Sequence, residues 1–129
     1  MTHPHEDLMR RSYDAFGQGD LDAVLSVFTD TIRFCIPGSS PVSGVYLGPA
    51  EVMAFFGKIF ELSGGTLTLE VHDVLANDEH VVVLVRERAE RDGKTFASTE
   101  AHVWHVSDGK ATEFWALPSD QAASDAFWS

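Results

Sequence analysis

The chain contains 129 residues, of which 20 are acidic and 9 are basic, and its formal net charge is -11. Charge of this sign repels phosphate backbones and anionic lipid surfaces, so neither nucleic acid nor a membrane is expected as a partner. The one cysteine, Cys35, excludes an internal disulfide, and no apolar run approaches the ~20 residues of a membrane span. Because the first residues are polar and unlike a signal peptide, we expect one cytoplasmic domain over residues 1–129.

Three helices are expected in the first half of the chain, where apolar side chains recur at helical spacing. Their ranges are 6–17, Asp20 to Phe28, and Pro49 to the Gly64-Gly65 pair. Between the second and third, residues 31–36 alternate apolar with polar side chains and predict a half-buried strand. Residues 37–48 are rich in Gly, Pro and Ser and predict a loop.

The second half of the chain predicts strands only, except for a short amphipathic tail after Pro118 that is helical in part. The expected strands are Thr66–Ala76, His80–Arg91, Lys94–Ser107 and Lys110–Leu117. Asp92-Gly93 and Asp108-Gly109 separate the last three, and such pairs form two-residue hairpin turns. The order predicts an α+β domain in which the helices cover one face of a curved, mostly antiparallel sheet.

Motifs along nearly the whole chain carry a resemblance to a known family. They are Tyr13 to Asp22, Phe28, Asp30, Pro37-Gly38, Gly44, Tyr46, Gly48, Leu69 to Leu75, Asp108-Gly109-Lys110, Glu113-Phe114-Trp115, Pro118 to Gln121, Asp125 and Phe127-Trp128. With them the chain resembles the SnoaL-like and ketosteroid-isomerase-like proteins of the nuclear transport factor 2-like superfamily. The resemblance implies a cone-shaped fold, which hosts isomerases, cyclases, epoxide hydrolases, dehydratases and non-catalytic modules.

Counting outward from the turns predicts which side chains share a face of the sheet, because opposed residues lie on the same side. The face expected to meet the helices contains Leu67, Leu69, Val71, Asp73, Val82, Leu84, Arg86, Arg88, Ala97, Thr99, Ala101, Val103, Phe114 and Ala116. The other face is expected to contain His72, Val83, Val85, Glu87, Glu100, His102, Trp104, Glu113, Trp115 and Leu117. Its polar and large aromatic side chains suit a homodimer interface.

A small apolar molecule is the expected ligand, held between the sheet and the helices. The expected wall consists of Phe34, Ile36, Tyr46, Phe56, Phe60, Val71, Leu84, Thr99, Ala101, Val103, Phe114 and Ala116. Asp73 is the one carboxylate on the predicted inner face, where burial would make it a general base; the alternative is a strand-end Asp satisfied by backbone or solvent. Arg86 could stabilise an oxyanion, and Tyr13 could donate to a carbonyl oxygen or only fill the core.

Other reactive side chains receive structural interpretations. His102 falls on the predicted outer face, which favours packing or an interface over catalysis. His80 and His105 are expected to pair at the end of the sheet, and without a third ligand no metal site is expected. Cys35 lies between apolar neighbours and is expected to be a buried structural thiol.

The resemblance also implies where catalytic groups would stand in related enzymes. The acids of the steroid isomerases align with Ile36 and Ala101, and their tyrosine aligns with Ser12. The Arg-x-Asp pair of the limonene-epoxide-hydrolase-like proteins reads Arg86-Glu87-Arg88 here, and their second Asp aligns with Ala116. Each departure removes a proton-transfer group that the family uses.

Three functions stay open at this point. The first is cofactor-free proton transfer on a carbonyl compound, such as an isomerisation or an aldol-type cyclisation. The second is a ligand-binding module that makes no bonds, which the missing acids favour. The third is a dimeric scaffold, for which Trp104 and Trp115 would form the interface.

Overall fold

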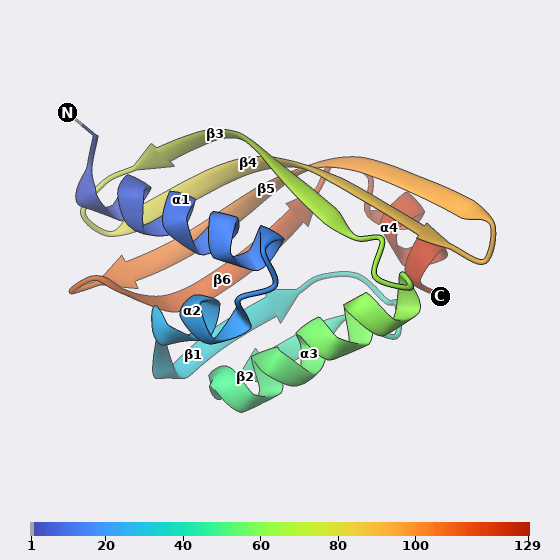
Figure 1. Ribbon diagram of the computed structural model, residues 1–129, viewed down its shortest axis with the longest axis horizontal. Helices are drawn as coiled ribbons and strands as arrows, with labels where there is room; N and C mark the ends of the chain where they lie inside the picture. The colour runs from blue at the N-terminus through green and yellow to red at the C-terminus, as the bar shows by residue number, and fades with distance from the viewer. Residues whose placement is uncertain (1) are drawn as a thin grey trace.

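The structure is a computed structural model that describes residues 2–129. Six strands form one sheet in the order β2-β1-β6-β5-β4-β3, and helices cover one of its faces (Figure 1). The elements are α1 (Pro4–Gly17), α2 (Leu21–Ser26), β1 (Phe28–Ile36), β2 (Gly44–Leu47), α3 (Gly48–Leu62), β3 (Thr68–Ala76), β4 (His80–Arg91), β5 (Lys94–Ser107), β6 (Lys110–Pro118) and α4 (Gln121–Trp128). The α+β class and the order of the expected elements are confirmed.

The strand β2 was not expected, because its residues fall within the predicted loop. It pairs antiparallel with β1, from Arg33 opposite Leu47 to Ile36 opposite Gly44. Four residues among glycine and proline show no period of their own, so pairing with β1 rather than local sequence makes this segment a strand. The sheet is mixed, because β1 also pairs with β6 in parallel.

The helices pack on different parts of the sheet. α1 lies against β3 and β4, whereas α3 lies against β1 and β2. The short helix α2 contacts α1, α3 and β1. In Figure 1 the long strands β4 and β5 curve over α1 toward α4, which packs on β5 and β6.

Helix α4 is held against the loop after β1. Gln121 Nε2 donates to the Pro37 carbonyl at 3.4 Å, and the Arg91 guanidinium donates to the Phe127 carbonyl at 3.1 Å. Gly38 has φ +95, and a Cβ there would overlap the Asp125 carboxyl. The loop therefore needs glycine at this point for its backbone conformation and for its close approach to α4.

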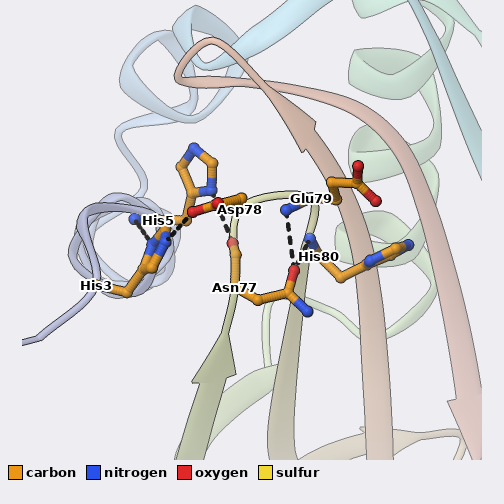
Figure 2. A network of polar contacts seen from close by, with 6 residues as sticks. All are labelled: His3, His5, Asn77, Asp78, Glu79 and His80. Atoms are coloured by element: carbon orange, nitrogen blue, oxygen red, sulfur yellow. Dashed lines mark hydrogen bonds and ion pairs between the residues drawn. The ribbon is translucent and has the colours of Figure 1, made fainter.

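Histidines fix the first turn of α1 to the β3–β4 turn (Figure 2). His3 Nε2 donates to Asp78 Oδ1 at 2.9 Å, and His5 Nδ1 donates to the Asn77 carbonyl at 3.1 Å. The Asn77 side-chain oxygen accepts from the backbone N–H groups of Glu79 and His80, which closes the turn. These contacts hold one end of α1 in place over the sheet.

The predicted hairpins and the β4–β5 register are confirmed. Asp92 and Gly93 have φ values of 52° and 77°, and the second Asp-Gly pair has nearly the same values, as two-residue hairpin turns require. Leu84 lies opposite Ala101. His80 also lies opposite His105, with ring centroids 4.6 Å apart.

A bulge in β3 changes which residues face the helices. On the turn side of the bulge, Asp73 pairs with Leu84 instead of the expected Val82, and beyond it Val71 pairs with Val85 instead of the expected Leu84. One extra residue in a strand turns every following side chain to the other face. Val71 therefore faces the helices, whereas Asp73 faces away from them.

The ladder between β5 and β6 contains a second irregularity, between the pairs formed by His105 and Val106. Past it, Phe114 pairs with Trp104 instead of the expected Val103. The prediction that Phe114 points toward the helices was correct. On β5, however, Val103 was predicted to point the same way, and the structure places Trp104 there instead.

The predicted faces of β4 and β5 are therefore exchanged. The side chains buried under the helices are Val81, Val83, Val85, Glu87, Ala89, Phe96, Glu100, His102, Trp104 and Val106. Those on the opposite face are Val82, Leu84, Arg86, Arg88, Ala97, Thr99, Ala101 and Val103, all exposed or only partly buried. Leu67, Leu69, Val71, Phe114 and Ala116 point toward the helices as expected, because the two irregularities lie between them and the strands β4 and β5.

Within residues 2–129, no helix is long and apolar enough to cross a bilayer.

Adjacent valines of β4 test the exchanged faces. Val83 is fully buried, whereas Val82 is partly exposed on the other side of the sheet. Val83→Ala should lower the free energy of unfolding by about 2 kcal/mol, because a buried side chain is truncated and leaves a cavity. Val82→Ala, the matched control, should cost less than about 1 kcal/mol in the same urea titration. Equal losses would contradict this assignment of faces.

Candidate functional site

A cavity of about 120 Å³ lies between the sheet and the helices. Its wall is mostly apolar, and most of its members come from the core of the domain. The apolar lining consists of Phe16, Val24, Phe28, Phe34, Ile36, Pro37, Val42, Phe55, Phe56, Ile59, Leu67, Leu69, Trp104, Phe114, Ala116, Pro118 and Trp128. A concave apolar space of this kind suits a small organic ligand.

Aromatic rings form one continuous side of the cavity. Phe34 and Phe114 stack with centroids 4.1 Å apart, because they are paired residues of the parallel strands β1 and β6. The ring centroids of Trp104 and Phe114 are 4.4 Å apart, and Phe56 meets Phe34 edge-on with centroids 5.9 Å apart. Rings packed against one another in this way make a stiff wall with a defined shape.

Five polar or part-polar side chains meet at the sheet side of the cavity, and we refer to them as the polar cluster. The polar cluster consists of Tyr13 on α1, Glu87 on β4, and Glu100, His102 and Trp104 on β5. The three β5 residues are at every second position, so they line one face with a spacing of about 7 Å.

Hydrogen bonds in the polar cluster fix the tautomer of His102. Its Nε2 lies 3.0 Å from Glu100 Oε1, and since a carboxylate only accepts, Nε2 holds the proton. Nδ1 must then accept, and Tyr13 Oη donates to it at 2.6 Å. The Trp104 indole N–H in turn donates to Tyr13 Oη at 3.0 Å. Every donor therefore has an acceptor, and Glu100 lies at the receiving end.

Glu87 lies beside Glu100, in surroundings that favour its protonated form. Burial raises the pKa of Glu87 well above its usual value, and the hydrogen bond with Glu100 and the charge of Glu100 raise it further, against the opposing effect of His102. Two carboxyl groups this close share a proton rather than ionise together. The pair thus offers one acid and one carboxylate side by side in an apolar cavity.

The other titratable groups of the polar cluster are uncharged. Burial lowers the pKa of His102 to about 4, and Glu87 would act in the opposite direction only when it is ionised. Burial also raises the pKa of Tyr13, and the charge of Glu100 adds to this, whereas the Trp104 hydrogen bond lowers it. Neither group is therefore an ion near neutral pH, and no histidine cation balances the carboxyl pair.

Six of the predicted site residues line the cavity: Tyr13, Phe34, Ile36, Phe56, Phe114 and Ala116. Tyr46, Phe60 and Val71 pack against the core but do not line it. Tyr46 donates instead to the Val42 carbonyl at 2.7 Å, and Phe60 stacks on Phe16. Leu84, Thr99, Ala101 and Val103 were placed in the wall wrongly, because they lie on the opposite face of the sheet.

The expected positions of Asp73 and Arg86 inside the cavity are also wrong. Asp73 is exposed, and its carboxylate accepts from the backbone N–H of Val74 at 2.8 Å, which is the alternative that the sequence left open. Arg86 is exposed on the outer face and pairs with Glu70 at 3.0 Å. Neither can reach a ligand in the cavity.

Sequence reasoning missed Glu87, Glu100 and His102 as site residues. The predicted inner face of the sheet contained Arg86 and Arg88 but only one carboxylate, Asp73. Burying an arginine without a paired carboxylate is costly in free energy. The opposite parity buries the unbroken alternation Val81, Val83, Val85 and was the better choice on that ground. The contrast between buried arginines on one face and buried valines on the other was the feature of the sequence that could have identified the inner face.

Comparison with known proteins supports the resemblance. The model of the SnoaL-like domain matches residues 9–114. The chain belongs to the SnoaL-like family. An uncharacterised protein of Mycobacterium tuberculosis H37Rv is 35% identical to this SnoaL-like chain over 124 residues, which is 95% of each protein.

Solved structures with the same architecture extend this comparison. Bal32a, from a soil-derived mobile gene cassette, has a TM-score of 0.91 and 29% identity, with 95% of both chains covered. A putative SnoaL-like polyketide cyclase from Jannaschia sp. CCS1 has a TM-score of 0.78 and 17% identity, covering 100% of this chain and 97% of that one. At that identity the second likeness shows the fold alone.

The neutral imidazole of His102 makes stability depend on pH. The unfolded chain gains a proton on this histidine near pH 6.5, whereas the folded chain does so only at about pH 4. The contribution is therefore complete above pH 6.5 and is lost as the pH falls toward 4. Between pH 7 and 4.5, wild type should lose about 2 kcal/mol more than His102→Gln in urea titrations. Equal losses in the two proteins would disprove a buried neutral imidazole.

Glu87 should act with the opposite sign, because its pKa is raised. Its stabilising contribution is complete below pH 4.5 and is lost as the pH rises through the folded value. An amide mimics the protonated acid, so Glu87→Gln should become progressively more stable relative to wild type, in free energy of unfolding and in melting temperature, as the pH rises from 5 to 8.5. Glu90→Gln, at an exposed position of the same strand, is the control and should show no such trend.

Proposed function

We propose that this SnoaL-like protein binds a small apolar carbonyl compound in the cavity and isomerises it by proton transfer, in the cytoplasm. The observation that supports this most directly is the pair of buried carboxyl groups, Glu87 and Glu100, in contact with each other and with the cavity. Titratable groups with perturbed pKa values in an apolar cavity are typical of acid–base sites.

The pair can supply both halves of an enolisation. The Glu100 carboxylate removes a proton from the carbon next to the carbonyl, and the electrons of that C–H bond form the new C=C bond. The protonated Glu87 donates its proton to the carbonyl oxygen, which receives the electrons of the C=O π bond. The proton has then moved from Glu87 to Glu100 in the pair, and no net charge has formed.

The contact between the two carboxyl groups resets the site. After the enol leaves, proton transfer from Glu100 back to Glu87 restores the starting state. In an isomerisation, Glu100 instead gives its proton to the far carbon of a conjugated dienol, the electrons of the O–H bond re-form the C=O bond, and the O–H proton returns to Glu87. Such acid–base assistance is worth about 10²–10⁴-fold in rate. The scheme needs no cofactor, since every proton and electron comes from the substrate and the pair.

The rest of the polar cluster is assigned to positioning. His102 donates to Glu100 at 3.0 Å and is itself held by Tyr13 at 2.6 Å. The hydrogen bond from His102 restricts the rotation of the Glu100 carboxylate, and the bond from Tyr13 holds the His102 ring. Together they set the direction of the other Glu100 oxygen. In this scheme the tyrosine hydroxyl does not contact the substrate, because its two hydrogen bonds are made within the polar cluster.

A second candidate is ligand binding without chemistry. The polar cluster satisfies its own hydrogen bonds, and the family's catalytic positions at Ile36, Ala101 and Ala116 hold apolar residues. A homodimer is compatible with either function. We assign its interface to the outer sheet face, where Trp115 and Leu117 are 37% and 47% exposed.

Hydrogen–deuterium exchange at carbon distinguishes catalysis from binding. With phenylacetone in D2O, NMR should show α-proton loss that wild type accelerates and Glu100→Gln slows at least 100-fold. Glu87→Gln should keep ketone binding but lose most of the acceleration, because an amide cannot give up its proton to the oxygen. Glu90→Gln should behave as wild type.

Two outcomes would contradict the catalytic proposal. Ketone binding with exchange no faster than in buffer would leave only the binding module. Exchange that survives both glutamine substitutions would show that other groups transfer the proton.

A further inference from the structure

The ionisable side chains that line the cavity are acidic or neutral. Its lining includes Glu87, Glu100 and His102 but no lysine or arginine among the described residues. Eight of the nine basic residues are exposed, and Arg91, the partly buried one, donates to the Phe127 carbonyl of α4. A ligand with a carboxylate or phosphate would therefore lie near acidic groups and meet no cation.

The lack of water around these side chains strengthens their effect on the charge of a ligand. Glu100 and His102 have side-chain exposures of 8% and 7%, so little water screens them. Like charges inside a protein repel much more strongly than at its surface. An anion entering the cavity would also lose its hydration without gaining a paired charge.

The hydrogen-bonding groups of the cavity suit a ligand with a neutral acceptor better than a cationic ligand. Glu100 already accepts from His102 and is hydrogen-bonded to Glu87. An ammonium group has three donors to place, and the remaining wall is mainly hydrocarbon. A carbonyl oxygen only accepts, so it can receive the one hydroxyl of protonated Glu87 when that hydroxyl turns from Glu100 to the ligand.

Cavity volume limits the skeleton of the ligand. About 120 Å³ is somewhat less than the ~150 Å³ of an engineered apolar cavity that holds benzene. One six-membered ring with a short substituent is therefore the size of ligand that fills this volume. A four-ring skeleton would extend beyond it and leave rings outside the aromatic wall.

We propose that the substrate is an uncharged, single-ring ketone, with its oxygen at Glu87 and its ring against Phe34, Phe56 and Phe114. This deepens the proposed function and rests on it. The cavity selects its ligand by the absence of cationic side chains, by the acid pair on β4 and β5, and by its size.

Three ring-matched probes test the charge preference: phenylacetone, phenylacetate and 2-phenylethylamine. We would measure their dissociation constants at pH 7.5 by Trp fluorescence, since Trp104 and Trp128 line the cavity, and confirm them by calorimetry. Phenylacetone should bind at least tenfold more tightly than either ion. Progesterone, a four-ring ketone, should bind at least tenfold more weakly than phenylacetone.

Variants link the preference to the acid pair. In Glu87→Gln/Glu100→Gln the preference for phenylacetone over phenylacetate should fall to less than threefold, whereas Arg86→Gln on the outer face should leave it unchanged. If the double variant does not fold, the wild-type ranking alone decides. Tightest binding by phenylacetate, by the amine or by the steroid would each overturn the proposal.

Failure of the inference differs from failure of the proposed function. Binding of all three probes with equal affinity would overturn the charge selection and leave a ligand-binding cavity. A clear preference for the ketone without α-proton exchange would support the inference and remove the catalysis. No binding by any probe would overturn both.

Discussion

The hydrogen-bonded ladder between β4 and β5 turns alternate side chains of both strands toward the helices, and the site depends on which alternate set that is. Its twelve residue pairs run without interruption from His80–His105 to Arg91–Lys94. Because the side-chain period of a strand is two, the ladder buries either the set with Val83 and His102 or the set with Leu84 and Ala101. The structure buries the first set, and this brings both glutamates into the interior.

Burial of the polar cluster is acceptable because its charges are limited. One proton shared by Glu87 and Glu100, a neutral imidazole and a neutral phenol leave a single formal charge among these groups. Tyr13 Oη accepts from the Trp104 indole N–H and donates to His102, and His102 donates to Glu100. Isolated buried charges are far more costly. The same arrangement that makes burial tolerable also leaves an acid and a base next to the cavity.

Family membership and site chemistry are separate conclusions for this chain. The SnoaL-like family and the shared architecture follow from the comparisons, whereas the acid pair occupies strand positions adjacent to those that resemblance pointed to, with Glu100 beside Ala101 and Glu87 beside Arg86. A one-residue displacement along a strand moves a side chain through the sheet. Within one fold, catalytic groups can therefore change face without any change in the order of elements.

The sequence by itself determined the elements and their local geometry. Helical spacing, the capping Asp20 and the two Asp-Gly turns act over a few residues, so they predicted the order of elements, both hairpins and the β4–β5 register. The alternation of Val81, Val83 and Val85 indicated the buried set of β4, but only the tertiary structure decided how the faces of neighbouring strands combine. Bulges in β3 and between β5 and β6 each insert one residue, and nothing in Val71 to Asp73 or near Val106 distinguishes these segments from regular strands. The bulges belong to the pairing between strands, and so the cavity residues beyond the six predicted correctly became known only from the fold.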